Sequence, residues 1–408
     1  MNKDLRLLRA SVPLWFLVLL SATAVRIAAH GQSAQSSDLT VHEWGTFTSI
    51  AGEDGSAVDW DALGCKDDLP RFVNDHGDRG TKWRLDGTVR METPVMYFYS
   101  PRELEAHVTV AFPHGLITEW YPKAEYEVDQ TSRVDGSMRR LAANLSGIDT
   151  SLRTVTGGIE WKSIKVQPGS APVLPVESGP SRYYAARGTD AAPIAVGDQH
   201  EKFLFYRGVG RFQVPLSARL SGNGQTVVEN RGPGSVPRMF LFENRGGHVG
   251  YRRADAVQNV VSFDSLTLDR PLPSLLDDLE TALVAQGLFP MEARAMVETW
   301  RDSWFEEGSR LLYIVPPAAV DAILPLQIEP VPSQIVRAFV GRIELLTPKT
   351  TRSVEEAMAR SDWSAIDRYG RFLDPILKRI DSRDPSKASQ VDQFRRDIHG
   401  FIGDESCR

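Results

Sequence analysis

The segment VHEWGTFTS, residues 41–49, carries the side chains whose types and spacing are best suited to chemistry. It is rich in β-branched and aromatic residues, and successive side chains of a β-strand point to opposite faces. One face of this strand would carry Val41, Glu43, Gly45 and Phe47, and the other His42, Trp44, Thr46 and Thr48. Glu43 therefore lies on the apolar face of the predicted strand.

A carboxylate on an apolar face must pair with a cation or hold its proton, because an unpaired buried charge is costly. One interpretation is structural, with Glu43 paired to one of the arginines of the chain. The other is catalytic, with Glu43 as a general acid whose pKa is raised, as in glycosidases. Because structural ion pairs perturb carboxylates as active sites do, the structural interpretation is favoured.

Two further strand glutamates, Glu92 and Glu119, extend the catalytic hypothesis. Glycosidases use two carboxylates, and aromatic side chains can pack against sugar rings. The candidate catalytic residues are therefore Glu43, Glu92 and Glu119, and the candidate ligand-binding residues are His42, Trp44, Trp120 and Tyr121. The alternative is that these aromatic side chains belong to the core, which is their more frequent position in strands.

The sequence predicts no metal site and no cofactor. No histidine pair has HxH or HExxH spacing, and two cysteines alone cannot form a structural zinc site. Acidic residues crowd the loop from Glu53 to Asp68, where Ca²⁺ binding is a minority alternative to a solvated loop. Nucleophile-elbow, phosphate-binding and dinucleotide-binding motifs are also absent from the sequence.

The first 34 residues have the pattern of a secretory signal peptide. A basic start precedes a 14-residue, largely apolar run from Val12 to Val25, and small residues follow. This run is short for a membrane span, which needs about 20 apolar residues, although an uncleaved anchor is the alternative. We therefore expect a secreted or periplasmic protein, with no membrane contact after cleavage.

Export would permit a disulfide between Cys65 and Cys407, the two cysteines of the chain. The alternative is a pair of unbonded thiols, because a domain of this size does not need a disulfide to fold.

The charge of the chain argues against nucleic acid as a partner. The formal net charge is −6, and removal of residues 1–34, which contain four basic groups and one acid, changes it to −9. An acidic protein without a basic run binds phosphate backbones poorly. Hydrophobic content of 42% is sufficient for a substantial core.

The elements that would position these residues are mainly strands. Residues 39–265 contain many short β-branched and aromatic runs separated by Gly, Pro, Asn and Asp, which predicts one or two antiparallel β-sandwiches. Residues 271–408 are predicted to be helix-rich, with capping boxes at Ser274 and Ser353. Two late strands, 310–316 and 335–346, should return to the N-terminal sheets, and Gly341 should mark a bulge or close approach.

Four motifs carry a resemblance to a known group of proteins: VHEWGTFTS, EWYP (119–122), LPLQIEP (324–330) and YGRFLDPI (369–376). At these motifs the chain resembles uncharacterised exported bacterial proteins, and the similarity runs through most of the chain after the leader. That group has no established activity, so the resemblance implies export but assigns no catalytic residue.

Two functions from different classes remain open. The first is an exported binding or scaffold protein of the cell envelope, with a glycan or an envelope protein as its partner. The second is an extracellular hydrolase of the glycosidase type that uses Glu43 with Glu92 or Glu119. The sequence favours the first, because no catalytic motif is found. A concave pocket with converging carboxylates would favour the second.

Overall fold

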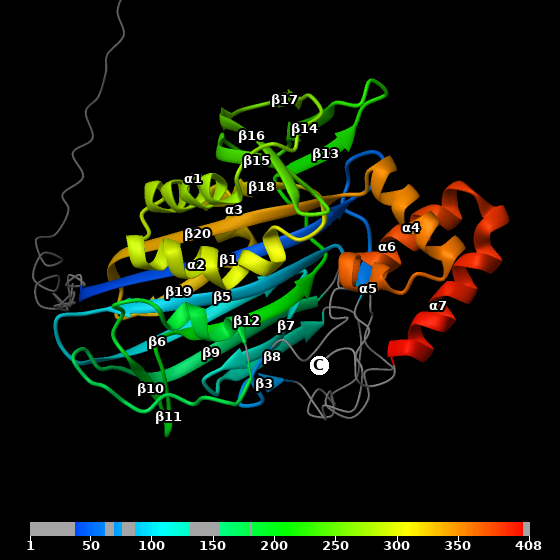
Figure 1. Ribbon diagram of the computed structural model, residues 1–408. Helices are drawn as coiled ribbons and strands as arrows, with labels where there is room; N and C mark the ends of the chain where they lie inside the picture. The colour runs from blue at the N-terminus through cyan, green and yellow to red at the C-terminus, as the bar shows by residue number, and fades with distance from the viewer. Residues whose placement is uncertain (1–36, 62–68, 76–85, 131–154, 180, 403–408) are drawn as a thin grey trace, which may run out of the picture. The chain divides into compact units, whose positions relative to one another are not determined.

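The computed structural model describes residues 37–61, 69–75, 86–130, 155–179 and 181–402. A mixed sheet of 15 strands dominates this part of the chain (Figure 1). Its main path runs through β11 (Gln199–Glu201), β10 (Ile194–Val196), β9 (Val155–Val166), β7 (Gly115–Tyr121), β12 (Leu204–Gly210), β5 (Val89–Tyr99), β1 (Ser37–Ala51), β20 (Pro332–Leu345), β18 (Gly308–Ile314), β15 (Val236–Arg245) and β16 (His248–Val257). Beside this path lie β3 (Asn74–Asp75), β6 (Leu104–Pro113), β8 (Glu125–Gln130) and β19 (Leu326–Glu329).

Smaller sheets and helices complete the described fold. A three-stranded antiparallel sheet consists of β13 (Leu216–Leu220), β14 (Thr226–Asn230) and β17 (Val260–Phe263). A separate two-stranded sheet consists of β2 (Trp60–Asp61) and β4 (Asp86–Gly87). The helices are η3 (Arg182–Arg187), α1 (Leu272–Ala285), α2 (Pro290–Trp304), α3 (Pro317–Ile323), α4 (Pro348–Arg360), α5 (Ser364–Tyr369), η4 (Gly370–Phe372), α6 (Leu373–Arg383), η5 (Pro385–Lys387) and α7 (Ala388–Ile402). The prediction of a mainly β protein with a helical C-terminal portion is confirmed.

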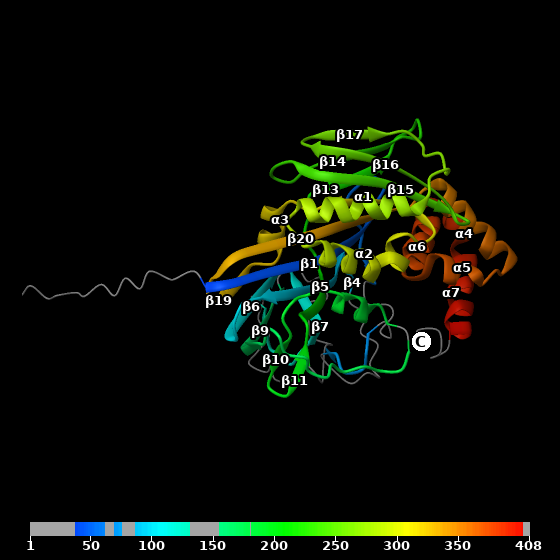
Figure 2. The ribbon, with the colours of Figure 1, turned by 60° about the vertical axis from the view of Figure 1, so that its left-hand side comes forward.

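The centre of the large sheet joins strands that are far apart in the sequence. β1 and β20 run parallel and lie side by side in both ribbon views (Figure 1, Figure 2), with Glu43 opposite Arg337. β18 then pairs with β20 and with β15. The predicted return of the two late strands is confirmed. A Cβ at Gly341 would lie 2.1 Å from the Tyr313 ring, so this glycine marks the expected close approach.

One face of the large sheet forms a sandwich-like layer with other strands. Apolar side chains of its central strands, such as Phe47 and Met96, pack in one cluster with Val110 of β6 and Ile159 of β9. Side chains of the three-stranded sheet, including Leu216, also pack in this cluster. Burial of apolar area between these layers is the main source of stability for this part of the fold.

Helices cover the opposite face. Figure 1 shows α1 and α2 lying across the central strands, and their apolar stripes pack against Trp44 and Tyr97 of the sheet. Leu279 of α1 and Met296 of α2 are fully or almost fully buried in this second cluster. Helices α4–α7 gather at one end of the sheet (Figure 2), where they bury Ile50 of β1. Among the described helices, none has the length and apolar content needed to span a bilayer.

Several predicted boundaries need correction. Helix α1 begins at Leu272 after Pro271, and the Ser274 hydroxyl bonds back to the Pro271 carbonyl, so Ser274 is not an N-cap. Helix α4 likewise begins earlier than predicted, because Thr347 is its N-cap and accepts a hydrogen bond from the Thr350 amide. Ser353 therefore lies inside the helix. Strand β16 was not predicted, because the exposed Arg252, Arg253 and Asp255 obscure the β pattern.

Candidate functional site

Glu43 lies in a buried ion pair on the sandwich side of the sheet. Its side chain is fully buried, and its Oε2 lies 2.6 Å from Nε of Arg337 on the neighbouring strand. The hydroxyl of Tyr206 on β12 donates a hydrogen bond to the other carboxylate oxygen. Burial and the Glu43 charge raise the pKa of Tyr206 well above its usual value, so this phenol stays a donor. The strand register predicted from the sequence therefore holds.

Arg337 extends this pair to a helix. Its Nη1 donates to the Leu324 carbonyl at 2.7 Å and to Asp321 of α3 at 2.9 Å. Burial alone would lower the pKa of Arg337, but the Glu43 carboxylate and the Tyr206 oxygen raise it. Both oxygens of Glu43 are thus occupied by donors, and one donor carries a permanent charge. This arrangement suits a structural anion and not a general acid.

Glu92 and Glu119 lie on the opposite face of the sheet from Glu43. Glu92 is 2.9 Å from Arg371 of η4, and Glu119 is 2.7 Å from Arg207 of β12. Burial alone would raise the pKa of Glu92, but the charges of Arg371 and Arg90 outweigh it and hold the pKa well below its usual range. The pKa of Glu119 is lowered against the same opposing effect of burial, first by Arg207.

The structure therefore does not bring the three candidate catalytic glutamates together. Glu92 and Glu119 share the electrostatic influence of Arg90, whereas the sheet separates both from Glu43. Each of the three is held by an arginine, and for Glu92 and Glu119 the lowered pKa favours the ionised form. A glycosidase needs one carboxyl group that keeps its proton, and none of these groups has the environment for that.

A row of buried charges continues past Glu92 across the same face. Arg310 of β18 and Arg342 of β20 are fully buried and share the Glu344 carboxylate, at 2.9 and 3.1 Å. Arg342 also contacts Glu306 at 2.5 Å and donates to the Ser303 carbonyl at 2.8 Å, which fixes the end of α2. Sequence reasoning missed this row, although charged residues inside apolar strands such as RLLYIVP and VGRIELL are its signal.

His42 lies on the helix-covered side of β1 and contacts α2. Its Nδ1 is 2.7 Å from the Glu292 carboxylate, and both side chains are fully buried. The same carboxylate accepts hydrogen bonds from the Tyr99 hydroxyl at 2.8 Å and from the Phe289 amide at 2.7 Å. Burial, and then the Glu292 charge, raise the pKa of Tyr99 well above its usual value. Glu292 therefore joins β1, β5 and the start of α2.

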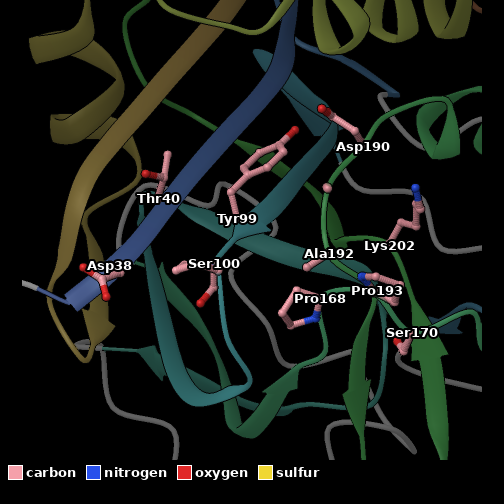
Figure 3. A pocket seen from close by; sticks show the side chains of 13 residues that line it. Asp38, Thr40, Tyr99, Ser100, Pro168, Ser170, Asp190, Ala192, Pro193 and Lys202 are labelled. Carbon is pink, nitrogen blue, oxygen red and sulfur yellow. The ribbon is translucent and has the colours of Figure 1, made fainter.

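Tyr99 also lines an open pocket next to this cluster. The pocket has a volume of about 490 Å³. In Figure 3 the Tyr99 ring lies between Thr40, its cross-strand neighbour, and Asp190. Other polar side chains of the lining come from Asp38, Ser100, Ser170 and Lys202. The Lys202 ammonium donates to the Thr189 carbonyl at 2.5 Å, which holds it at the rim.

The aromatic residues predicted to bind ligand belong to the core instead. Trp44 is fully buried, and Trp120 and Tyr121 are only 5% and 3% exposed. His42 is likewise fully buried and cannot touch a ligand in the pocket, although it supports Tyr99 through Glu292. Their burial does not favour the ligand-binding roles predicted for these four residues, which stay a prediction. Tyr99 was missed because strand alternation does not show which aromatic ring lies beside an opening.

The acidic loop and the two cysteines were also predicted as candidate sites. Cys65 and Cys407 lie outside the described residues, as do Asp67 and Asp68 of the loop. Glu53 pairs with Arg383 at 2.5 Å. Two other acids of the loop also have partners: Asp54 accepts a hydrogen bond from the Ser56 amide, and Asp59 pairs with Arg211. Within the described ranges, no three His, Cys, Asp or Glu side chains gather as metal ligands.

Comparisons with known proteins add no family. No protein-family model and no curated protein matches the sequence. The solved structures that resemble the fold include the yeast delta-COP-I mu-homology domain, alone and complexed with a Dsl1 WxWxV peptide. The domain alone shares 7% sequence identity with this chain, and the match covers 76% of this chain and 95% of the domain. The peptide complex shares 6% identity, and the match covers 76% of this chain and 96% of the domain. The TM-score is 0.24 for each. Likeness at this level supports no argument about fold or function, and the resemblance at the four sequence motifs stays a prediction.

Proposed function

We propose that this is an exported binding protein of the cell envelope that takes a glycan, or part of one, in the Tyr99 pocket. The observation that carries the proposal is the half-buried Tyr99 ring at an open polar pocket, with its hydroxyl bonded to the fully buried Glu292. Export rests on the leader pattern of residues 1–34.

The chemistry of the lining suits a polyhydroxylated ligand. The face of an aromatic ring is negative, so it attracts the weakly positive C–H groups of a sugar. The carboxylates of Asp38 and Asp190 can accept hydrogen bonds from hydroxyl groups, and Lys202 can donate to them. A volume of about 490 Å³ lies in the range of sites for small ligands.

The position of Tyr99 is fixed before any ligand arrives. The edge-to-face contact with Phe289, at 4.9 Å between ring centroids, and the Glu292 bond hold the ring. Glu292 is in turn held by His42. A ring that is already ordered loses little entropy on binding, which favours affinity.

Binding is preferred to hydrolysis because of the carboxylates. Glu43, Glu92 and Glu119 are each paired with an arginine, and the pKa of Glu92 and of Glu119 is lowered. A glycosidase acid needs the opposite shift. The hydrolase alternative therefore lacks the proton donor that it requires among the predicted residues.

The test is a glycan array on the purified protein, followed by calorimetric titration of the best ligand. Tyr99→Ala should abolish binding, whereas Tyr99→Phe should retain part of it, because the ring remains and only its bond to Glu292 is lost. Tyr126→Ala, on β8, is the matched control and should bind like the wild type. Thermal melting should verify that each variant is folded.

Two results would count against the proposal. The first is an array without any bound glycan, which would leave an envelope protein as the partner to search for. The second is equal affinity of folded Tyr99→Ala and the wild type for a glycan that does bind.

A further inference from the structure

A second pocket lies between the three-stranded sheet, the segment 211–215 and helix α3. It has a volume of about 780 Å³ and shares no lining residue with the Tyr99 pocket. Neither the sequence motifs nor the proposed glycan site makes use of it. A pocket of this size can hold most of a small ligand.

The charged side chains that line this pocket are positive. Arg211 and Arg231 both line the pocket, and among the described residues of its lining there is no Asp or Glu. Arg211 pairs with Asp59 at 2.6 Å and Arg231 with Glu229 at 3.1 Å, but both acids are about half exposed. Pairs with such exposed partners are weak, because water screens them. A bound anion can therefore share or replace these partners.

The rest of the lining is largely apolar. Phe212 and Val214 come from the segment that leads into β13, Leu216 is the first residue of β13, and Ala319 and Ile323 come from α3. The Phe212 ring is fixed by edge-to-face contacts with Phe47 and Phe112, at 5.5 and 5.9 Å. This side of the pocket offers a rigid hydrophobic surface beside the two cations.

The backbone holds both arginines in place. The Arg211 amide donates to the His114 carbonyl at 2.7 Å, and the Arg231 amide donates to the Pro215 carbonyl at 2.8 Å. Gly232 donates to the same carbonyl at 3.1 Å. The two segments that carry the cations are therefore anchored to the turn between β6 and β7 and to the residue before β13, so the pocket needs little reorganisation on binding.

We infer that this pocket binds an amphipathic anion, a carboxylate with an acyl chain of medium length. The carboxylate lies against Arg211 and Arg231, because guanidinium groups match its planar geometry. The acyl chain packs on Phe212 and the α3 side chains, where its burial drives binding. An uncharged alkyl compound lacks the interaction with the arginines, and a short anion such as acetate lacks the apolar contact.

The inference is tested by calorimetric titration of the whole exported chain with decanoate below its micelle concentration. Decanoate should bind at least tenfold more tightly than 1-decanol and than acetate. Arg231→Gln and Arg211→Gln should each weaken decanoate binding by about tenfold, the effect of losing a hydrogen bond to a charged group. Arg219→Gln, an exposed arginine of β13 outside the pocket, is the matched control and should change nothing.

A fourth variant separates ligand binding from a structural role of the arginine. Asp59→Asn removes the competitor of Arg211 and should strengthen decanoate binding by up to about fivefold. Tyr99→Ala should leave decanoate binding unchanged, so the glycan proposal can fail without affecting this one. Equal binding of 1-decanol and decanoate, absence of decanoate binding, or an unchanged affinity in folded Arg231→Gln would each overturn the inference.

Discussion

Replacement of Glu43 by Gln should destabilise the protein strongly, because the variant keeps the shape and removes the charge. The carboxylate accepts hydrogen bonds from Arg337 Nε and the Tyr206 hydroxyl, one at each oxygen. A Gln side chain can accept one of them, but its amide NH₂ would then face the other donor. The Arg337 charge would also lose its buried partner.

The magnitude follows from these losses. A hydrogen bond to a charged group contributes about 1.5–3 kcal/mol, and breaking a buried ion pair by removing one partner costs about 3–5 kcal/mol. Asp321 also contacts Arg337, but its side chain is 64% exposed. Such an exposed partner offsets about 0–1 kcal/mol. We therefore expect the free energy of unfolding to fall by about 3–4 kcal/mol in Glu43→Gln.

The assay is equilibrium unfolding in urea, monitored by tryptophan fluorescence. The slope of the free energy of unfolding against urea concentration is compared between variants. Glu298→Gln is the control, because its pair with Arg301 is exposed and its loss should cost less than about 0.5 kcal/mol. The double variant Glu43→Leu with Arg337→Met should recover much of the loss, since apolar replacement of a buried pair is often tolerated. A loss below about 1 kcal/mol in Glu43→Gln would refute the reasoning, because a carboxyl that held its proton would be replaced at little cost.

The remaining predictions concern pH and packing. The pKa of Glu92 is lower in the folded protein than its ordinary value of 4.5, so its pairing stabilises above pH 4.5 and loses this effect as the pH falls below it. The difference in free energy of unfolding between the wild type and Glu92→Gln should therefore shrink from about pH 6 to about pH 3, and a constant difference would contradict the pairing. Gly341→Ala should cost about 1–3 kcal/mol, because its Cβ would meet the Tyr313 ring at 2.1 Å. Adding Tyr313→Leu should restore part of the loss, and equal stability of Gly341→Ala and the wild type would show that the ring moves freely.

Sequence reasoning succeeded where the information is local. Alternation along β1 placed Glu43 among apolar side chains, and the structure buries it fully. The identity of its partner could not be predicted, since Arg337 lies 294 residues away and many arginines were available. The return of strands 310–316 and 335–346 was predicted from composition, but the parallel pairing of β20 with β1 and the antiparallel pairing of β18 with β20 depend on the whole fold.

The site residues were harder to predict, because residue type does not distinguish a core ring from one at an opening. Trp44, Trp120 and Tyr121 have the composition of a sugar-binding surface, yet they are buried. Irregular pairing also matters: Thr93 has a φ of 45°, and the pairing of β1 with β5 shifts near it. This shift helps to place Glu92 on the helix-covered face, a position that simple alternation does not reveal.

The buried pair at Glu43 explains why the motif VHEWGTFTS is needed even if it catalyses nothing. β1 and β20 must find each other in one parallel register, and Glu43 lies opposite Arg337 in that register. A slip by one residue would place Glu43 opposite Val336 or Ala338 and turn a charge toward an apolar layer. On its other edge β1 pairs with β5, with Thr40 opposite Tyr99, and His42 of β1 contacts Glu292, so the Glu43 pair, by holding β1 in place, also supports the wall of the proposed glycan pocket. We therefore expect Glu43→Gln to weaken glycan binding through the position of Tyr99, in proportion to the loss of stability and without any change in the ligand preferred.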